Sequence, residues 1–385
     1  MLLPAGQGQW SLYINAYAFG IVALSFGLPQ ALTYHIAAKK LLKEQVLVHS
    51  LAFALSIGVI FFISIFCLTY SSLAEVFLPN NIPAWWLYVG LGMHFVLLLA
   101  NQVLIAIFHA NKKFVLAAGI SMAGALLLLL LYGMFYAKGQ FSYSQYVGGF
   151  IVGNVIVLLL QFLSALFLLK KQLNYTINIK SWSVSFYKPL VLFASWIYIT
   201  NLIQFLSYKM DVWFISAYVS DDSQLGIYTV TASLAQLLWL LPSAFHSVIF
   251  TDIAEENTLA LRQKIKLWTI KILMLSILLG LVGYGVSFMA IPLLFGEAYN
   301  RISAILPYIL PGIIIFSGSI LISAYFSGIN RIDINFKSTL LGFLFCLILN
   351  IVLIPNYGIV GAAISSSVAY AISAFYLYVL FSKEA

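Results

Sequence analysis

Four polar side chains are spaced so that they share one face of a single apolar segment. Asn201, Gln204, Tyr208 and Asp211 fall within an arc of about 80° on a helix of about 100° per residue. A stripe that faced lipid would leave its polar groups without partners, so it should face other helices or a wet cavity. Such side chains can bind hydroxyl groups, and the carboxyl of Asp211 could also take up a proton or a sodium ion.

The next apolar segment carries a second polar stripe at helical spacing. Its members are Thr229, Ser233, Gln236 and Ser243, with His246 just beyond the arc. Hydrogen bonding between helices, with no ligand, is the alternative for both stripes. We favour a cavity because two neighbouring segments carry the same pattern.

Two charges lie well inside the segment that bears the first stripe. Lys209 and Asp211 are two positions apart, so on a helix they point about 160° away from each other and do not pair directly. A charge at mid-membrane costs roughly 2.5 to 3.5 kcal/mol, so each needs a partner. Lys209 would meet an anionic ligand, an acid on another helix or the interface by snorkelling. A purely structural hydrogen-bonding role for Asp211 stays open.

Asn154 and Gln161 add polar groups earlier in the chain, seven positions apart and on one helical face. They suit either hydroxyl binding or helix packing. We find no paired carboxylates, no Ser/His/Asp grouping and no phosphate-binding glycine loop, so the sequence predicts no enzyme. Cys67 and Cys346 lie in separate apolar segments, and neither belongs to a cluster of metal ligands.

The segments that carry these residues have the composition of membrane spans. The chain of 385 residues is 63% hydrophobic and 8% charged, where soluble domains carry roughly 25% charged residues. A helix needs about 20 apolar residues to cross a bilayer, and lipid cannot satisfy exposed backbone groups. We therefore expect an all-α membrane protein with 11 transmembrane helices. The expected spans are 12–34, 47–70, 86–108, 114–136, 145–169, 190–218, 224–250, 267–295, 303–326, 335–354 and 359–381.

The basic residues alternate between the gaps that separate these spans. Of the 19 Lys and Arg residues, 15 lie in the odd-numbered gaps or the C-terminal tail, and two lie in even-numbered gaps. This positive-inside signal predicts a cytoplasmic C-terminus. The charge is spread over short loops, so the net charge of +8 does not indicate a nucleic-acid partner.

The gap at 170–189 divides the chain into two predicted lobes of parallel repeats, 1–175 and 176–385. Residues 8–12 (GQWSL) echo 226–230 (GIYTV), and Pro29 corresponds to Pro242. If the repeats match, a first helix would precede residue 1, giving two lobes of six helices around a central cavity. We expect upstream DNA to encode about 20 further apolar residues. Pro29 and Pro242 are candidate hinges, although proline is also tolerated in membrane helices.

Several segments resemble the bacterial polysaccharide repeat-unit flippases, in the superfamily of multidrug and lipid-linked oligosaccharide exporters. The segments are 2–12 (LLPAGQGQWSL), 27–32 (GLPQAL), 211–215 (DVWFI) with 225–228 (LGIY), and 350–355 (NIVLIP) with 357–363 (YGIVGAA). The last is the most specific, and the resemblance covers nearly the whole chain except the family's first helix. It implies two six-helix lobes around a cavity in the bacterial inner membrane.

The resemblance also implies a function, which is translocation of undecaprenyl-pyrophosphate-linked oligosaccharide for O-antigen, lipopolysaccharide or related surface polysaccharides. Lipid-linked oligosaccharide and membrane lipids would be the partners, together with the polysaccharide polymerase machinery. No cofactor or metal is expected, and coupling to H+ or Na+ is left open. The alternatives are a cation-coupled drug or small-molecule antiporter of the same superfamily, a membrane glycan polymerase, and an inactive fragment.

Overall fold

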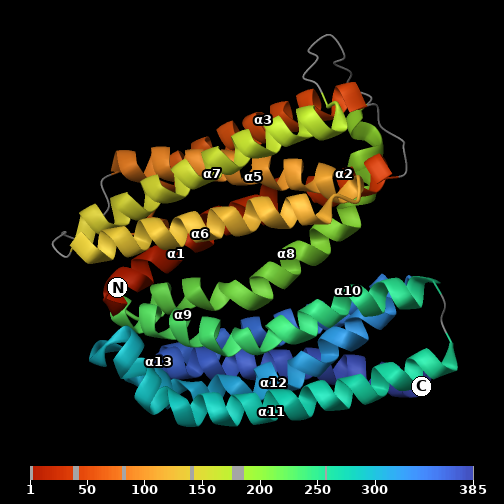
Figure 1. Ribbon diagram of the computed structural model, residues 1–385. Coiled ribbons are helices and arrows are strands. Elements are labelled where there is room, and N and C mark those ends of the chain that lie inside the picture. Colours follow the sequence, from red (N-terminus) through yellow and green to blue (C-terminus); the bar gives the residue numbers. More distant parts are fainter. Residues whose placement is uncertain are drawn as a thin grey trace. The chain divides into compact units, whose positions relative to one another are not determined.

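The computed structural model describes residues 3–37, 43–79, 84–138, 143–175, 186–255 and 258–384, and these are almost entirely helical. Their contacts divide the chain into two compact units, drawn in Figure 1. Unit 1 comprises Met1–Leu12 and Ile203–Ala385, and unit 2 comprises Tyr13–Leu202. The boundary lies within a helix rather than in the gap at 170–189, and the predicted lobes remain a prediction. Lys39, Lys40 and Lys180 of the predicted cytoplasmic gaps lie outside the described residues.

Unit 2 is organised around α5. Its helices are α1 (Pro4–Leu24, from Tyr13 on), α2 (Leu28–Ala37), α3 (Lys43–Thr69), the short α4 (Ala74–Phe77), α5 (Ala84–Ala110), α6 (Phe114–Lys138) and α7 (Tyr143–Leu173). Helix α5 packs against α2, α3, α6 and α7. Leu99, Val103 and Ile107 recur every four residues along it and are fully buried. This spacing is the apolar face that a packed helix requires.

Unit 1 contains the later helices of the chain. They are α8 (Tyr187–Tyr218, from Ile203 on), α9 (Asp222–Gln236), the 3-10 turn η3 (Leu237–Trp239), α10 (Leu240–Glu255), α11 (Leu259–Phe295), the turn η4 (Glu297–Tyr299), α12 (Arg301–Gly328) and α13 (Ile332–Glu384). Helix α12 packs against α9, α10, α11 and α13, so it forms the centre of this unit (Figure 1).

The helices break near the two predicted hinge prolines. Helices α1 and α2 are bent by 48° at a break ahead of Pro29, where Phe26 and Gly27 have positive φ angles of 48° and 65°. In the second half, η3 interrupts the helical run three residues before Pro242. Proline clashes with the preceding helical turn and removes a backbone donor, which explains irregular geometry there. A hinge function at either proline remains a prediction.

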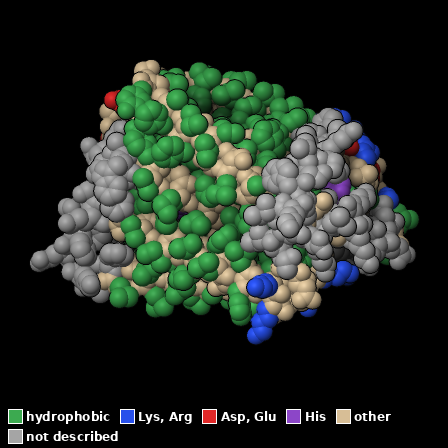
Figure 2. Space-filling model, turned by 90° about the horizontal axis from the view of Figure 1, so that it is seen from above, with side chains coloured by type: hydrophobic (Ala, Val, Ile, Leu, Met, Phe, Trp, Pro, Cys, Tyr) green, Lys and Arg blue, Asp and Glu red, His purple; other side chains and the backbone are tan. Residues whose placement is uncertain are grey.

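The prediction of an all-helical membrane fold is confirmed. Within the described residues eight helices are long and apolar enough to cross a membrane, or nine if α1 and α2 form one bent span. Helix α13 contains both of the last two predicted spans, with a kink at Gly358 (φ 57°) between them. Large apolar side chains are exposed on these helices, and Figure 2 shows that they cover much of the described surface on one face. Such a surface suits lipid.

A glycine makes the close packing of α12 on α13 possible. The backbone N–H of Gly312 donates to Ser367 Oγ at 2.8 Å, and a Cβ on Gly312 would lie 2.2 Å from the carbonyl oxygen of Ser367. Small residues let membrane helices approach in this way.

We expect Gly312→Ala to lower the melting temperature of the detergent-solubilised protein, because two backbones would have to separate to admit one methyl group. The loss should be about 1 to 3 kcal/mol, the usual cost of overpacking. Gly283→Ala in α11 is the matched control, since a Cβ there meets nothing within 4 Å. Equal melting temperatures for the two variants would show that the close packing of α12 on α13 does not require a glycine at position 312.

Candidate functional site

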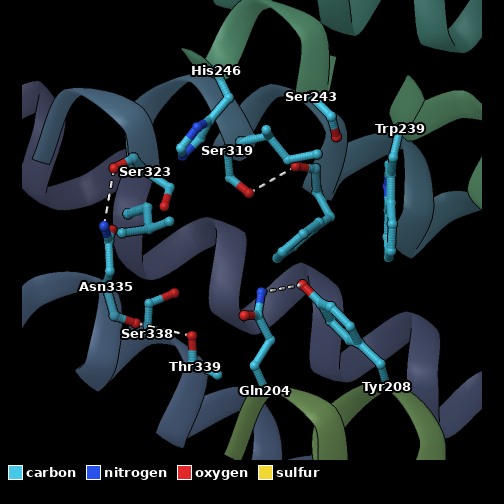
Figure 3. A pocket seen from close by; sticks show the side chains of 13 residues that line it. Gln204, Tyr208, Trp239, Ser243, His246, Ser319, Ser323, Asn335, Ser338 and Thr339 are labelled. Carbon is cyan, nitrogen blue, oxygen red and sulfur yellow. Dashed lines mark hydrogen bonds between the residues drawn. The ribbon is translucent and has the colours of Figure 1, made fainter. Parts of the chain in front are cut away.

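A polar pocket of about 360 Å³ lies within unit 1. Figure 3 shows polar side chains of α12 and α13 on one side of it and aromatic side chains on the other. The lining residues are Gln204, Tyr208, Trp239, Ser243, His246, Phe316, Ser319, Ile320, Ser323, Asn335, Ser338, Thr339 and Leu377. All 13 belong to the described part of the chain, and none of them is Asp, Glu, Lys or Arg.

Four residues of the two polar stripes line this pocket. Gln204 and Tyr208 come from the first stripe, and Ser243 and His246 come from the segment that carries the second. The sequence analysis missed the wall formed by α12 and α13. Ser319 and Ser323 are four positions apart on α12, and Ser338 and Thr339 follow Asn335 by three and four positions on α13, so the same test of helical periodicity could have found them.

Several polar groups in that wall already donate their hydrogens to protein. The hydroxyls of Ser319, Ser338 and Thr339 donate to the carbonyl oxygens of Phe316, Ser373 and Asn335 at 2.7, 2.9 and 3.0 Å. Each hydroxyl therefore keeps only accepting capacity for another group.

Asn335 likewise has no hydrogen left to donate. Its amide nitrogen donates to Ser323 O at 2.9 Å and to Ser327 Oγ at 2.8 Å, which uses both hydrogens. Its Oδ1 is buried and receives no hydrogen bond in the described structure. A buried acceptor without a donor is costly, and the Asn335 amide has no hydrogen left for a ligand.

An aromatic cluster forms the opposite side of the pocket. Trp239 lies 5.6 Å from Tyr208, 5.1 Å from Phe316 and 5.3 Å from Tyr370, measured between ring centroids. Trp239 Nε1 donates to the carbonyl oxygen of Ile313 at 3.0 Å, which fixes the orientation of the indole. Because Trp239 is the last residue of η3, the local break in the helix sets its direction.

Asp211 lies in a separate buried network, also within unit 1. Tyr228 donates a hydrogen bond to Asp211 Oδ2, and Ser366 Oγ donates to the same oxygen at 3.2 Å. The backbone N–H of Val212 donates to Oδ1 at 2.8 Å. Helices α8, α9 and α13 thus meet at one carboxyl that is 4% exposed. The network can hold the carboxyl in place, and a proton on Oδ2 would compete with the two hydroxyl donors there.

The remaining residues of the two stripes do not line the pocket. Lys209 is partly buried on α8, and Asn201 lies on the part of α8 that belongs to unit 2. Ser233 is exposed and donates to Thr229 O at 2.8 Å, while Gln236 ends α9 next to η3.

Asn154 and Gln161 make contacts between neighbouring helices of unit 2. Asn154 Nδ2, on α7, donates to Tyr132 OH, and Gln161 Nε2 donates to the carbonyl oxygen of Ile120 at 3.1 Å. Both acceptors belong to α6. These bonds join α6 to α7, and a hydroxyl-binding role for the pair remains a prediction.

The start of α1 packs very closely against the start of α9 inside unit 1. A Cβ on Gly8 would lie 2.3 Å from the carbonyl oxygen of Asp222, and one on Gly226 would lie 1.8 Å from that of Pro4. Ser11 Oγ donates to Thr229 Oγ1 at 2.8 Å, and Gln9 Nε2 donates to Asp222 Oδ2 at 2.6 Å. We call this the α1–α9 contact. It pairs Gly8 with Gly226 and Ser11 with Thr229, the positions that the sequence repeat had matched.

Comparisons with solved structures place this fold among membrane transporters. The chain is similar to an inward-facing multidrug resistance MATE family transporter of the MOP superfamily (TM-score 0.73, 18% identity, covering 100% of this chain and 91% of that one). It is also similar to the lipid II flippase MurJ in an inward closed conformation (0.71, 15%, 99% and 86%). A mutant of the Vibrio cholerae MATE transporter VcmN is a third similar structure (0.65, 15%, 99% and 94%).

No protein-family model matches the chain, and no curated protein sequence matches it. The structural similarities therefore define the fold, which is that of the MOP-superfamily transporters. At 15 to 18% identity these similarities show the fold alone, and the predicted superfamily and family remain predictions. Among the described residues no group of three or more His, Cys, Asp or Glu is arranged to bind a metal ion.

Proposed function

We propose that this protein translocates a lipid-linked oligosaccharide across the bacterial inner membrane for surface polysaccharide synthesis. The substrate would be an oligosaccharide repeat unit on undecaprenyl pyrophosphate, as the sequence resemblance implies. The observation that carries the proposal is the pocket of unit 1, whose lining is uncharged, rich in hydrogen-bonding groups and aromatic on one side. Sugars have many hydroxyls and an apolar C–H face, so such a lining complements them.

The place of the pocket along the helices supports this assignment. Ser319 and Ser323 lie toward the end of α12, and Asn335, Ser338 and Thr339 lie near the start of α13. The basic gap between these helices, with Arg331, is cytoplasmic according to the charge pattern. A substrate assembled on the cytoplasmic leaflet would meet this end of unit 1 first. The solved flippase of similar fold has lipid II as its named substrate.

A cation-coupled drug antiporter is the second candidate. The similar MATE transporters and the buried carboxyl of Asp211 favour it. The pocket itself offers no carboxylate among its 13 lining residues, so a cationic drug would lose hydration there without an opposite charge. For a membrane glycan polymerase, we find no supporting arrangement among the described residues.

Reconstitution separates these functions. Proteoliposomes with a fluorescent undecaprenyl-pyrophosphate oligosaccharide should expose the glycan to an external glycosidase faster than protein-free vesicles. Deletion of the gene should reduce surface glycan and leave lipid-linked repeat units inside the cell. If glycan exposure is unchanged and tetraphenylphosphonium is actively exported, the flippase proposal is wrong and the protein is a drug antiporter. Growth of the glycan chain in the same vesicles would indicate the polymerase.

A further inference from the structure

On one wall of the unit 1 pocket, four polar side chains have already donated their hydrogens to other protein groups. Their residue types alone do not reveal this. Ser319, Ser338 and Thr339 give their protons to backbone carbonyls. Asn335 has used both amide hydrogens, and its Oδ1 accepts nothing in the described structure. These four side chains, on α12 and α13, therefore have no hydrogen left to donate to a ligand.

An acceptor-rich wall discriminates against anions. Phosphate and carboxylate groups have no hydrogens to donate, and two acceptors facing each other repel. No Lys or Arg lies among the 13 lining residues to compensate a negative charge. Burial of an unpaired anion is strongly unfavourable even after the protein relaxes. Hydroxyl groups and acetamido N–H groups, by contrast, would supply the donors that this wall needs.

The aromatic side constrains the shape of the ligand. The face of an aromatic ring carries negative partial charge, and the C–H groups of a sugar ring are slightly positive, so the two pack face to face. Figure 3 places Trp239 and Tyr208 across the cavity from Asn335, Ser338 and Thr339. A sugar ring between the two walls would pack its C–H face on the aromatic side and direct hydroxyls to the acceptors.

We propose that this pocket binds an uncharged sugar ring of the transported glycan and excludes both its pyrophosphate and acidic sugars. The pyrophosphate of the lipid carrier must then be held elsewhere in the protein. This inference rests on the proposed function and makes it more specific, because it assigns the pocket to one part of the substrate.

Saturation-transfer NMR on the full chain in nanodiscs tests the inference. The probe is the repeat-unit oligosaccharide released by mild acid from the host's own surface polysaccharide, with inorganic pyrophosphate and tetraphenylphosphonium as competitors. We expect saturation on the ring protons of a neutral sugar, none on carboxylated or phosphorylated sugars, and no displacement by either competitor. Strongest transfer to an acidic sugar, displacement by pyrophosphate, or no transfer at millimolar oligosaccharide would overturn the inference.

Two pairs of variants connect the signal to this pocket. Trp239→Ala should reduce the transfer at least tenfold, while Trp268→Phe, on α11 outside the lining, should preserve it. Thr339→Val removes an acceptor at nearly constant volume and should weaken binding about fivefold, the value of one ordinary hydrogen bond. Thr339→Ser retains the hydroxyl and should bind nearly as the unsubstituted protein does. If Trp239→Ala binds the oligosaccharide as well as the unsubstituted protein does, the sugar does not bind in this pocket.

The outcomes also separate this inference from the proposed function. If proteoliposomes translocate the lipid-linked oligosaccharide but the NMR signal is independent of Trp239, the inference fails and the flippase assignment stands. If tetraphenylphosphonium binds in place of the oligosaccharide and is transported, both fail and the antiporter replaces them.

Discussion

Oxidation of the double variant Ser11→Cys, Thr229→Cys is expected to abolish glycan translocation, and reduction is expected to restore it. The two hydroxyl oxygens are 2.8 Å apart, so the new thiols would be close enough to form a disulfide with little backbone movement. The bridge would join the first helix to α9, which belong to different predicted lobes. Transporters with paired repeats work by moving one repeat against the other, so a covalent bond at this contact should stop the cycle.

A second cysteine pair provides the control. Ser287 Oγ and Ser303 Oγ are 2.9 Å apart on α11 and α12, two helices of the same predicted lobe, and both lie near the end that the charge pattern predicts to be external. The disulfide in Ser287→Cys, Ser303→Cys should leave translocation unchanged. Cys67 is exposed and is first replaced by serine, whereas Cys346 is buried and is left in place. Full translocation by the oxidised 11–229 pair would show that this contact stays closed throughout transport.

Asp211→Asn is expected to reduce surface glycan more than tenfold while the amount of protein in the membrane stays the same. Asparagine preserves the shape of the side chain, and its Oδ1 can still accept from Val212. Its amide nitrogen cannot accept from Tyr228 and Ser366, which now donate to one carboxylate oxygen. The substitution also removes the group that could bind a coupling proton or sodium ion.

The dependence on an ion gradient distinguishes coupling from a structural role. If Asp211 is the coupling group, an ionophore should lower export by the unsubstituted protein and have no effect on the residual export by Asp211→Asn. Ser366→Ala, which removes one donor and keeps the carboxyl, should remain gradient-dependent. We expect Lys209→Ala to reduce export as well. Normal surface glycan in both Asp211→Asn and Lys209→Ala would remove these residues from the mechanism.

The fold could be predicted from the sequence because its signals are local. The length and composition of each apolar segment predict a helix that can cross a membrane, whereas the side of the membrane that the basic gaps predict stays a prediction. The candidate hinge prolines coincide with irregular backbone, at the bend between α1 and α2 and just after η3.

The site could be predicted only in part, because its geometry depends on contacts distant in sequence. Asp211 was selected as a buried carboxyl, but Ser366, which hydrogen-bonds to it, lies 155 positions away. Helical spacing identified Gln204 and Tyr208, yet Trp239 reaches the pocket through a 3-10 turn, which departs from the 3.6-residue period used to find the stripes. Asn335 lies next to a basic loop, where a polar side chain is ordinary, so its unpaired oxygen could be found only in the structure.

Gly8 and Gly226 illustrate a constraint of a kind familiar from homodimers. At the centre of a two-fold symmetric dimer, a residue meets its own copy, and any enlargement is introduced twice at one point. The α1–α9 contact has this character within a single polypeptide, since matched positions of the two predicted repeats touch each other. The two codons can change separately, yet each glycine is held by the backbone opposite it, so a larger residue at either position meets the same obstacle.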